Sequence, residues 1–187
     1  MRVIAGTARR LSLMTPKGME TRPTLDREKE TLFNTLQNDV GGARFLDLFA
    51  GSGQIGIEAL SRGAKEAVFV EMGRDAAACI KKNLEHTKLS DKAVVYANDC
   101  LTAIAKLASK KESFDIIFLD PPYDSELYED TLSAIKRAGI LSEDGIVVVE
   151  SRLRTDLSFT EDLGFETIKT KEYKTNKHSL LRLSNKE

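Results

Sequence analysis

From residue 44 onward, short apolar runs alternate with longer segments whose apolar residues recur at helical spacing. The runs are short and almost wholly apolar, which is typical of strands buried on both faces. They occupy residues 45–49, 67–71, 93–97, 114–119 and 146–150. Between them, helices are predicted over 54–62, 74–88, about 101–108 and about 128–135. Such alternation predicts an α/β protein with a parallel sheet covered by helices on both faces.

The two ends of the chain follow different patterns. Residues 2–6 and 10–14 flank Gly6-Thr7-Ala8, which predicts a hairpin. Arg22-Pro23-Thr24 then opens a predicted helix that runs to about Gln37. We therefore expect residues 1–40 to form a hairpin-and-helix extension that binds RNA, on a main domain of residues 41–187. In the tail, segments 165–173 and 179–183 predict an antiparallel pair that closes one edge of the sheet.

Length and composition fit one soluble globular domain. The chain has 187 residues, of which 41% are hydrophobic and 30% charged. No apolar run reaches the roughly 18 residues of a membrane helix and the N-terminus has no signal-peptide core, so we expect a cytoplasmic location. Cys79 and Cys100 are expected to be buried reduced thiols. With His86 and His178 they lack metal-type spacing, so no metal site is predicted.

Charge is unevenly distributed along the chain. The net charge is −1, which by itself does not indicate a nucleic-acid partner. However, residues 1–22 carry five basic side chains against Glu20, and residues 167–178 carry four lysines against Glu172. A positive edge on a nearly neutral body suits a phosphate-rich partner contacted from one side, although scattered solvated charge is the simpler alternative.

A glycine loop follows the first strand of the predicted sheet. Gly51, Gly53 and Gly56 form G-x-G-x-x-G between that strand and a helix, where glycines allow a tight turn and close approach to a ligand. Glu71 ends the next strand 20 residues after Gly51, where a carboxylate can bind both hydroxyls of a ribose. Nicotinamide cofactors and S-adenosylmethionine both fit this pattern. Asp47 favours the latter, because a carboxylate near the loop repels a pyrophosphate and attracts a sulfonium or an ammonium group.

Asn98 and Asp99 follow the third strand and form a polar pair that could hold an adenine amine. Asp99 is also a good N-cap for the helix that begins near Leu101, and the two roles are compatible.

The fourth strand ends in Asp120-Pro121-Pro122-Tyr123. Two prolines fix the backbone and donate no N–H, so the segment is stiff and leaves its carbonyl oxygens free. A carboxylate, free carbonyls and an aromatic ring are suited to grip a planar base that carries an amine. In a doubly wound sheet this segment and the glycine loop lie at the same crevice, because strand order reverses between the first and fourth strands.

Together these residues resemble the class I S-adenosylmethionine-dependent amino-methyltransferases. More specifically, the chain resembles the bacterial 16S ribosomal RNA guanine-N2 methyltransferases, the RsmD family, over nearly its whole length. The segments that carry this resemblance are 2–6, 22–24, 26–27, 30–34 and 46–53. One departure is Thr175-Asn176-Lys177, where the family often has a glycine, which leaves the shape of the tail hairpin open.

The resemblance implies a fold, a reaction and a set of site residues. The fold is a Rossmann-like seven-stranded sheet with an antiparallel last strand and an N-terminal β-hairpin extension. The cofactor is S-adenosylmethionine, with S-adenosylhomocysteine as product and no metal; the partner is 16S ribosomal RNA or the small-subunit particle, and we expect the protein to act as a monomer. The implied cofactor-binding residues are Asp47, Phe49, Gly51, Ser52, Gly53, Gly56, Glu71, Asn98 and Asp99. The implied RNA-binding residues are Arg2, Arg9, Arg10, Arg22, Thr24 and Arg27.

The expected chemistry centres on Asp120. The exocyclic amine of guanine is a poor nucleophile because its lone pair is delocalised into the ring. Asp120 and a carbonyl of the Pro121-Pro122 turn can accept its two N–H groups and favour a pyramidal nitrogen, while Tyr123 stacks on the flipped-out base. The sulfonium already activates the methyl group, so alignment of nitrogen, methyl and sulfur would supply much of the rate.

Three other functions are compatible with parts of the sequence. An adenine N6 in RNA or DNA fits Asp120–Tyr123 equally well, although no recognition domain for DNA is evident. A dinucleotide-binding oxidoreductase fits the glycine loop but gives no role to Asp120–Tyr123. A non-catalytic ribosome assembly factor of this fold would not need an intact amine-binding corner.

Overall fold

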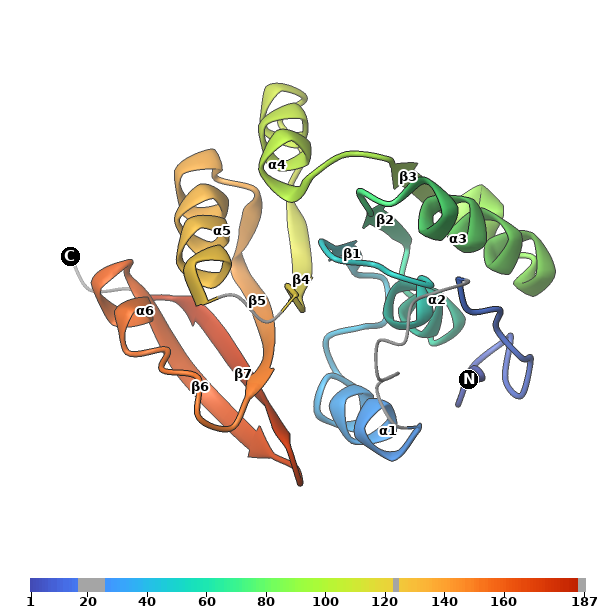
Figure 1. Cartoon of the computed structure of the whole chain (residues 1–187), viewed down its shortest axis with the longest axis horizontal. Helices are drawn as coiled ribbons and strands as arrows, with labels where there is room; N and C mark the ends of the chain where they lie inside the picture. Colours follow the sequence, from blue (N-terminus) through green and yellow to red (C-terminus); the bar gives the residue numbers. More distant parts are fainter. Residues whose placement is uncertain (17–25, 123–124, 185–187) are drawn as a thin grey trace.

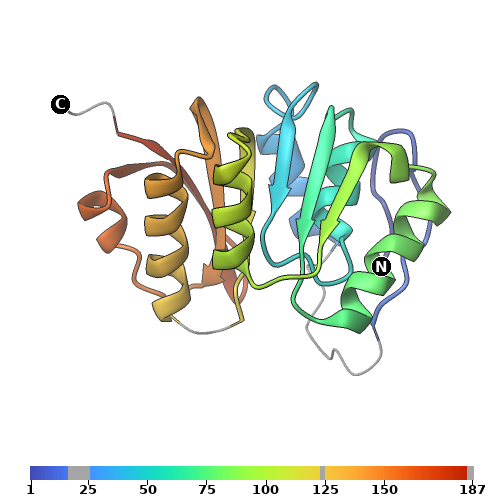
Figure 2. The same cartoon turned by 90° about the horizontal axis from the view of Figure 1, so that it is seen from above.

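The structure, a computed structural model, describes residues 1–16, 26–122 and 125–184. A seven-stranded sheet lies between two layers of helices (Figures 1 and 2). Its strand order is β3-β2-β1-β4-β5-β7-β6; β1 to β5 are parallel, whereas β7 is antiparallel to both β5 and β6. The strands are β1 Arg44–Asp47, β2 Glu66–Val70, β3 Ala93–Tyr96, β4 Phe114–Leu119, β5 Leu141–Arg152, β6 Phe165–Glu172 and β7 Asn176–Leu183. The predicted fold class is confirmed, and strand order reverses between β1 and β4.

The helices divide between the two faces of the sheet, as Figure 2 shows. Apolar side chains of α1, α2, α3 and the N-terminal segment pack on one face, in a cluster that includes Phe33, Phe45 and Phe118. Those of α4 and α5, such as Leu132, pack on the other face against strand residues such as Leu119. The helices are α1 Asp26–Thr35, α2 Gln54–Ser61, α3 Arg74–Thr87, α4 Cys100–Ser109, α5 Ser125–Ala138 and α6 Phe159–Asp162, with a short 3₁₀ turn, η1 Ser90–Lys92. No helix in the described part of the chain is long and apolar enough to span a membrane.

Most predicted elements are present, with shifted ends. β5 begins at Leu141 rather than at Ile146, and α6 and η1 were not predicted. The N-terminal hairpin is reduced to one bridge between Arg2 and Ser12. The tail forms the predicted antiparallel pair, β6 and β7. Cys79 and Cys100 are buried free thiols, as predicted.

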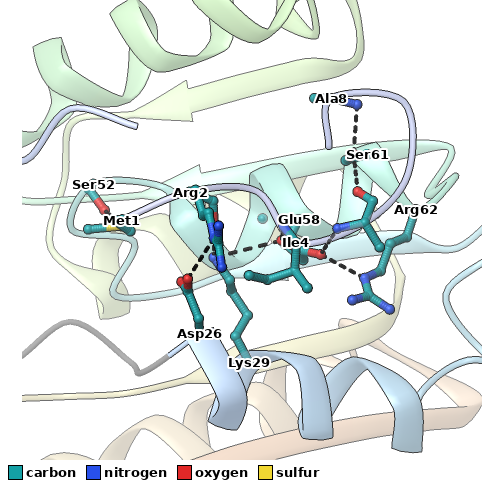
Figure 3. A network of polar contacts seen from close by, with 12 residues as sticks. Met1, Arg2, Ile4, Ala8, Asp26, Lys29, Ser52, Glu58, Ser61 and Arg62 are labelled. Carbon is teal, nitrogen blue, oxygen red and sulfur yellow. Dashed lines mark hydrogen bonds and ion pairs between the residues drawn. The ribbon is translucent and has the colours of Figure 1, made fainter. Parts of the chain in front are cut away.

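The N-terminal segment, residues 1–14, is fastened to α2 by one buried carboxylate. Glu58 accepts hydrogen bonds from the main-chain N–H groups of Ile4 (2.8 Å) and Ala5 (3.0 Å). It also pairs with Arg62 at 2.8 Å and with the buried Lys29 of α1 at 3.7 Å, as Figure 3 shows. Burial lowers the pKa of the Lys29 ammonium, whereas the Glu58 carboxylate raises it. Glu58 therefore joins three segments that are far apart in the sequence.

Other contacts hold the same segment at the end of α2. The Ser61 hydroxyl accepts from Ala8 N at 2.9 Å and donates to Ala5 O at 2.5 Å. Gly6 has a φ of +81°, and a Cβ there would lie 1.7 Å from Ser61 O, so only glycine fits. Val3, Ala8 and Leu13 share the hydrophobic cluster of α1 and the sheet. The division at residue 40 stays a prediction, but the two parts share one core.

Replacing Glu58 by Gln should lower the free energy of unfolding by about 3–5 kcal/mol, because it removes one partner of a buried ion pair and leaves the Lys29 ammonium uncompensated. Denaturant unfolding of wild type, Glu58→Gln and Glu85→Gln measures this. Glu85 is exposed on α3 and serves as the matched control, with an expected change within about 0.5 kcal/mol. Equal stabilities of all three proteins would contradict the role given to Glu58.

Candidate active site

Four acidic residues meet at one edge of the sheet, since the carboxyl ends of parallel strands lie together. Asp47 ends β1, Glu71 follows β2, Asp120 follows β4 and Glu150 lies near the end of β5. Side chains alternate along a strand. Asp47, Asp120 and Glu150 therefore share a face with Phe45, Phe118 and Val148, all in the cluster beneath α1 and α2. The acids thus lie on the helix-covered face where strand order reverses, as the sequence predicts for a ligand crevice.

The glycine loop has the predicted strand–loop–helix geometry. Gly53 is the N-cap of α2 with a φ of 80°, in the left-handed region that glycine adopts readily. A Cβ on Gly56 would lie 2.3 Å from the Phe69 ring, so this glycine allows α2 to pack closely on the sheet. Gly56 N also donates to the Asp47 carboxylate at 3.2 Å. Two predicted site residues, Gly56 and Asp47, are therefore in direct contact.

Glu71 is held in place by the main chain on both sides. Its two carboxylate oxygens accept from Gly51 N and from Gly73 N, each at 2.8 Å. A carboxylate has about four acceptor positions, so these bonds fix its orientation and leave positions for a ligand hydroxyl. Met72, the next residue, is 74% exposed and offers an apolar surface beside this carboxylate. Met72 was not among the predicted site residues.

Asn98 and Asp99 are engaged in local contacts after β3. Asp99 caps α4 by accepting from Thr102 N at 2.9 Å, and this bond lowers the pKa of its carboxyl. Asn98 Oδ1 accepts from Lys106 Nζ at 3.0 Å. The N-cap role of Asp99 is confirmed; the adenine contact of the pair stays a prediction.

Asp47 is fully buried, and its ionisation is perturbed. Burial, together with the negative charge of Glu71, raises the pKa of Asp47 to about 7, and the hydrogen bond from Gly56 opposes the rise. A buried carboxylate in this condition is stabilised by any cation that enters the site. This supports the interpretation of Asp47 as an acid suited to a positively charged ligand.

Asp120 and the two prolines follow β4, next to the strand end that leads into the glycine loop. The carboxyl of Asp120 can be reached from solvent, but nearby protein atoms displace much of its water. This desolvation, followed by the charges of Glu150 and Asp47, raises the pKa of Asp120 well above its ordinary value. Pro121 is buried and Pro122 is exposed. Tyr123 lies outside the described residues, so its predicted stacking role is untested.

The structure adds neighbours of Asp120 that the sequence analysis missed. Glu150 pairs with the buried His178 at 3.0 Å, and His178 contacts the Tyr173 hydroxyl at 3.0 Å. Asn176 donates to Glu150 at 2.9 Å. A signal for Glu150 was available, because the predicted strands over 67–71, 114–119 and 146–150 end in, or are followed by, an acid.

The predicted RNA-binding arginines gather around one groove. Arg2, Arg9, Arg10 and Arg27 line it together with Asp26 and others, and its volume is about 500 Å³. Arg2 pairs with Asp26 at 2.9 Å. Arg9, Arg10 and Arg27 are exposed. Arg22 and Thr24, the other two predicted RNA-binding residues, lie outside the described residues.

Two further features fit S-adenosylmethionine to the crevice. A Cβ on Gly51 would meet no protein atom within 4 Å, so the loop faces open space there. At the start of α2, the buried Oε1 of Gln54 has no hydrogen-bond partner among the described residues and could accept from an amino group. Elsewhere, no group of three or more His, Cys, Asp or Glu side chains suited to a metal ion occurs in the described part of the chain.

The sequence model of a protein family described as Conserved hypothetical protein 95 matches residues 1–182. The chain belongs to this family. Among its relatives, a putative rRNA methyltransferase, YlbH, of Bacillus subtilis is 42% identical over 160 residues, which cover 86% of this chain and 87% of the relative. Ribosomal RNA small subunit methyltransferase D of Escherichia coli is 39% identical over 157 residues, or 84% and 77% of the two chains.

Solved structures agree with this membership. A putative methyltransferase from Escherichia coli, yhhF, superposes with a TM-score of 0.86 at 32% identity, covering 100% of this chain and 99% of that one. The resemblance to the RsmD methyltransferases is thereby confirmed, and the family is one of methyltransferases.

The pKa of Asp47 predicts a pH dependence of stability. The folded protein keeps this proton up to about pH 7, whereas the unfolded chain loses it near its ordinary pKa of 3.8. The folded state is thus favoured at low pH, and this contribution is lost as pH rises from about 4 to about 7. Without cofactor, Asp47→Asn should therefore gain about 2–4 kcal/mol relative to wild type between pH 5 and pH 8. Denaturant unfolding of both proteins at each pH measures this, and parallel pH profiles would contradict it.

Proposed function

We propose that this protein transfers a methyl group from S-adenosylmethionine to the exocyclic N2 amine of a guanine in 16S ribosomal RNA of the small subunit. The observation that carries this proposal is the shared sheet edge: the glycine loop with Glu71 and the Asp120-Pro121-Pro122 corner occupy neighbouring strand ends of one sheet. The names of the relatives support the choice of ribosomal RNA. Such a substrate would place the protein in the cytoplasm.

On the cofactor side, the chain would hold the adenosine end of the ligand at Glu71 and Met72 and its positively charged end near Asp47. Glu71, fixed by Gly51 and Gly73, would bind the ribose hydroxyls, and Met72 would pack on the adenine. Asp47 would balance positive charge near the loop, while Phe49, Ser52, Asn98 and Asp99 complete the predicted set. When bound, the cofactor supplies an electrophilic methyl group on a cationic sulfur. The protein's part is to orient this group and exclude water.

On the base side, Asp120 would accept one N–H of the target amine and a carbonyl of the Pro121-Pro122 turn the other. These bonds strengthen as the nitrogen becomes pyramidal, so they stabilise the transition state more than the bound substrate. Pro121 and Pro122 donate no N–H of their own, and their fixed φ angles keep the carbonyl oxygens in place. Tyr123 is proposed to stack on the base.

RNA would be held by the groove of Arg2, Arg9, Arg10 and Arg27. The loop of residues 4–8, which borders this groove, is rigid because Glu58 and Ser61 of α2 accept hydrogen bonds from its main chain. A rigid loop loses little conformational entropy when its arginines bind phosphates. The groove is therefore preorganised for an extended anionic partner, with Arg22 and Thr24 proposed as further contacts and the tail lysines as diffuse ones.

Replacing Asp120 by Ala should lower the single-turnover rate of methyl transfer at least about 100-fold, because the lost hydrogen bond acts mainly in the transition state. Affinity for the cofactor should stay close to that of wild type, as calorimetry would show. Asp144→Ala, an exposed acid in β5, is the matched control and should retain the wild-type rate. A near-normal rate in Asp120→Ala would contradict the proposed role.

Reversing Arg9 and Arg10 to Glu should abolish methylation of ribosomal RNA or small-subunit particles and leave cofactor affinity unchanged. Wild-type RNA binding should weaken steeply between about 50 and 200 mM salt, as counterion release requires. Lys81 and Lys82, both exposed on α3, provide a control reversal with the same change in charge, which should methylate normally. Full activity of the Arg9 and Arg10 reversal would show that the groove does not bind the substrate.

A further inference from the structure

Glu150 is the register neighbour of Asp120 at the active-site edge. Leu119 of β4 pairs with Val149 of β5, so the next residue of each strand, Asp120 and Glu150, lie side by side on one face. Both carboxylate oxygens of Glu150 contact side chains of β7, the strand that flanks β5 on the side opposite β4. Oε1 accepts from Asn176 Nδ2 at 2.9 Å, and Oε2 lies 3.0 Å from His178 Nε2. Two carboxylates therefore meet at the proposed amine-binding corner, and one of them is held by a histidine.

His178 can carry either one or two ring protons without losing a hydrogen bond. It is 1% exposed, and its Nδ1 lies 3.0 Å from the Tyr173 hydroxyl. When the ring is neutral, Nε2–H donates to Glu150 and Nδ1 accepts from Tyr173. When the ring is protonated, Nδ1–H donates to Tyr173, whose hydroxyl turns to Glu28 O at 3.5 Å. No buried donor is left unpaired in either state.

Charged and titratable groups face His178 from several elements. Glu150 faces it from β5, the Phe118 ring from β4 at 6.3 Å edge-on, and Tyr173 from the turn before β7. From α1, the Glu28 carboxylate reaches the cluster through Asn176 at 3.3 Å. Lys171, the register partner of His178 on β6, is exposed. Tyr173 stays a neutral hydroxyl, because burial and the charges of Glu28 and Glu150 raise its pKa to about 12.

We propose that His178 is a positioning residue for methyl transfer: bound to Glu150 and Tyr173, it holds the Glu150 carboxylate and offsets its charge, so that Asp120 can be the carboxylate that accepts from the target amine. A hydrogen-bond donor on Glu150, and still more an imidazolium, offsets the charge that otherwise opposes ionisation of Asp120. Two neighbouring carboxylates without such a cation hold on to one proton between them. A protonated Asp120 would have lost one of its acceptors. The proposal rests on the role of Asp120 in the proposed function.

The test is the pH dependence, from about pH 5.5 to 9, of single-turnover methyl transfer to small-subunit RNA. In His178→Gln, the rise of the rate with pH should move to higher pH by about one unit, a loss of about tenfold at neutral pH that alkaline pH restores. Tyr173→Phe should move it the same way by less, because a protonated ring would lack an acceptor at Nδ1. Glu150→Gln should move it to lower pH.

A histidine substituted outside the site serves as the matched control. His86, the other of the two histidines, is exposed on α3, and His86→Gln should leave the profile unchanged. In Glu150→Gln the new amide oxygen can accept from His178. When the Asn176 amide turns over, the new NH2 group donates to Asn176 Oδ1, which is buried and has no partner among the described residues, at the loss of the 3.3 Å contact between Asn176 Nδ2 and Glu28. If His178→Gln fails to bind the cofactor, the pH profiles of Tyr173→Phe and Glu150→Gln test the proposal in its place.

Opposite shifts in the histidine and glutamate variants support the proposal. It is overturned if their profiles keep the wild-type midpoint, or if all rates fall equally at every pH, as for a purely structural role. Asp120→Asn, measured alongside, distinguishes a failure of the proposed role of Asp120 from a failure of the proposed role of His178. If it retains the wild-type rate, the proposed function of Asp120 has failed and this inference falls with it. If it is inactive while the midpoints coincide, only the inference is wrong.

Discussion

The crowding of desolvated acids at one edge of the sheet is the constraint on which the site depends. A parallel sheet brings its carboxyl ends together, and this chain places Asp47, Glu71, Asp120 and Glu150 there. Desolvation, followed by the charges of the neighbouring acids, raises the pKa of Asp47 and of Asp120. Main-chain N–H groups offset part of the repulsion at Glu71 and Asp47, and His178 does so at Glu150. A cationic ligand in the middle would relieve the rest, which explains why such a site suits a sulfonium.

The N-terminal segment and α1 present positive charge at the surface. Arginines on a free N-terminal segment would lose much entropy on binding RNA. Here Glu58, buried in α2, fixes the segment by two main-chain hydrogen bonds and pairs with Lys29 of α1. Three of the arginines that line the groove, Arg2, Arg9 and Arg10, therefore lie on a segment fastened to α2, the helix that begins at the glycine loop. Under the proposed function, recognition and catalysis would both depend on α2 without sharing residues.

Sequence periodicity was sufficient for the fold because each element carries a local signal. The apolar runs and the glycine loop specify strands and the turn at β1. The two tail segments predict the antiparallel pair, which the family resemblance also implies. The start of β5 was misplaced, because residues 141–145 include the polar Ser142, Glu143 and Asp144. A strand that extends beyond the core on one side shows no continuous apolar run there.

The candidate site was predictable where it follows strand ends and not where it depends on pairing between distant elements. Asp120 and Glu71 are recognisable because each follows an apolar run. His178 lies on β7, and only the register of β5 with β7 sets it opposite Glu150. Lys29 and Glu58 likewise read as surface charges on helices. Their burial arises from the docking of residues 1–14, which no local pattern specifies.

The central claim, that this protein methylates the N2 amine of a guanine in 16S ribosomal RNA, is tested most directly by the nucleosides of that RNA. Mass analysis of 16S RNA from cells that lack the protein should show the loss of one N2-methylguanosine, and its return when the wild-type chain is supplied. An unchanged content of N2-methylguanosine, or the loss of an N6-methyladenosine instead, would contradict the account.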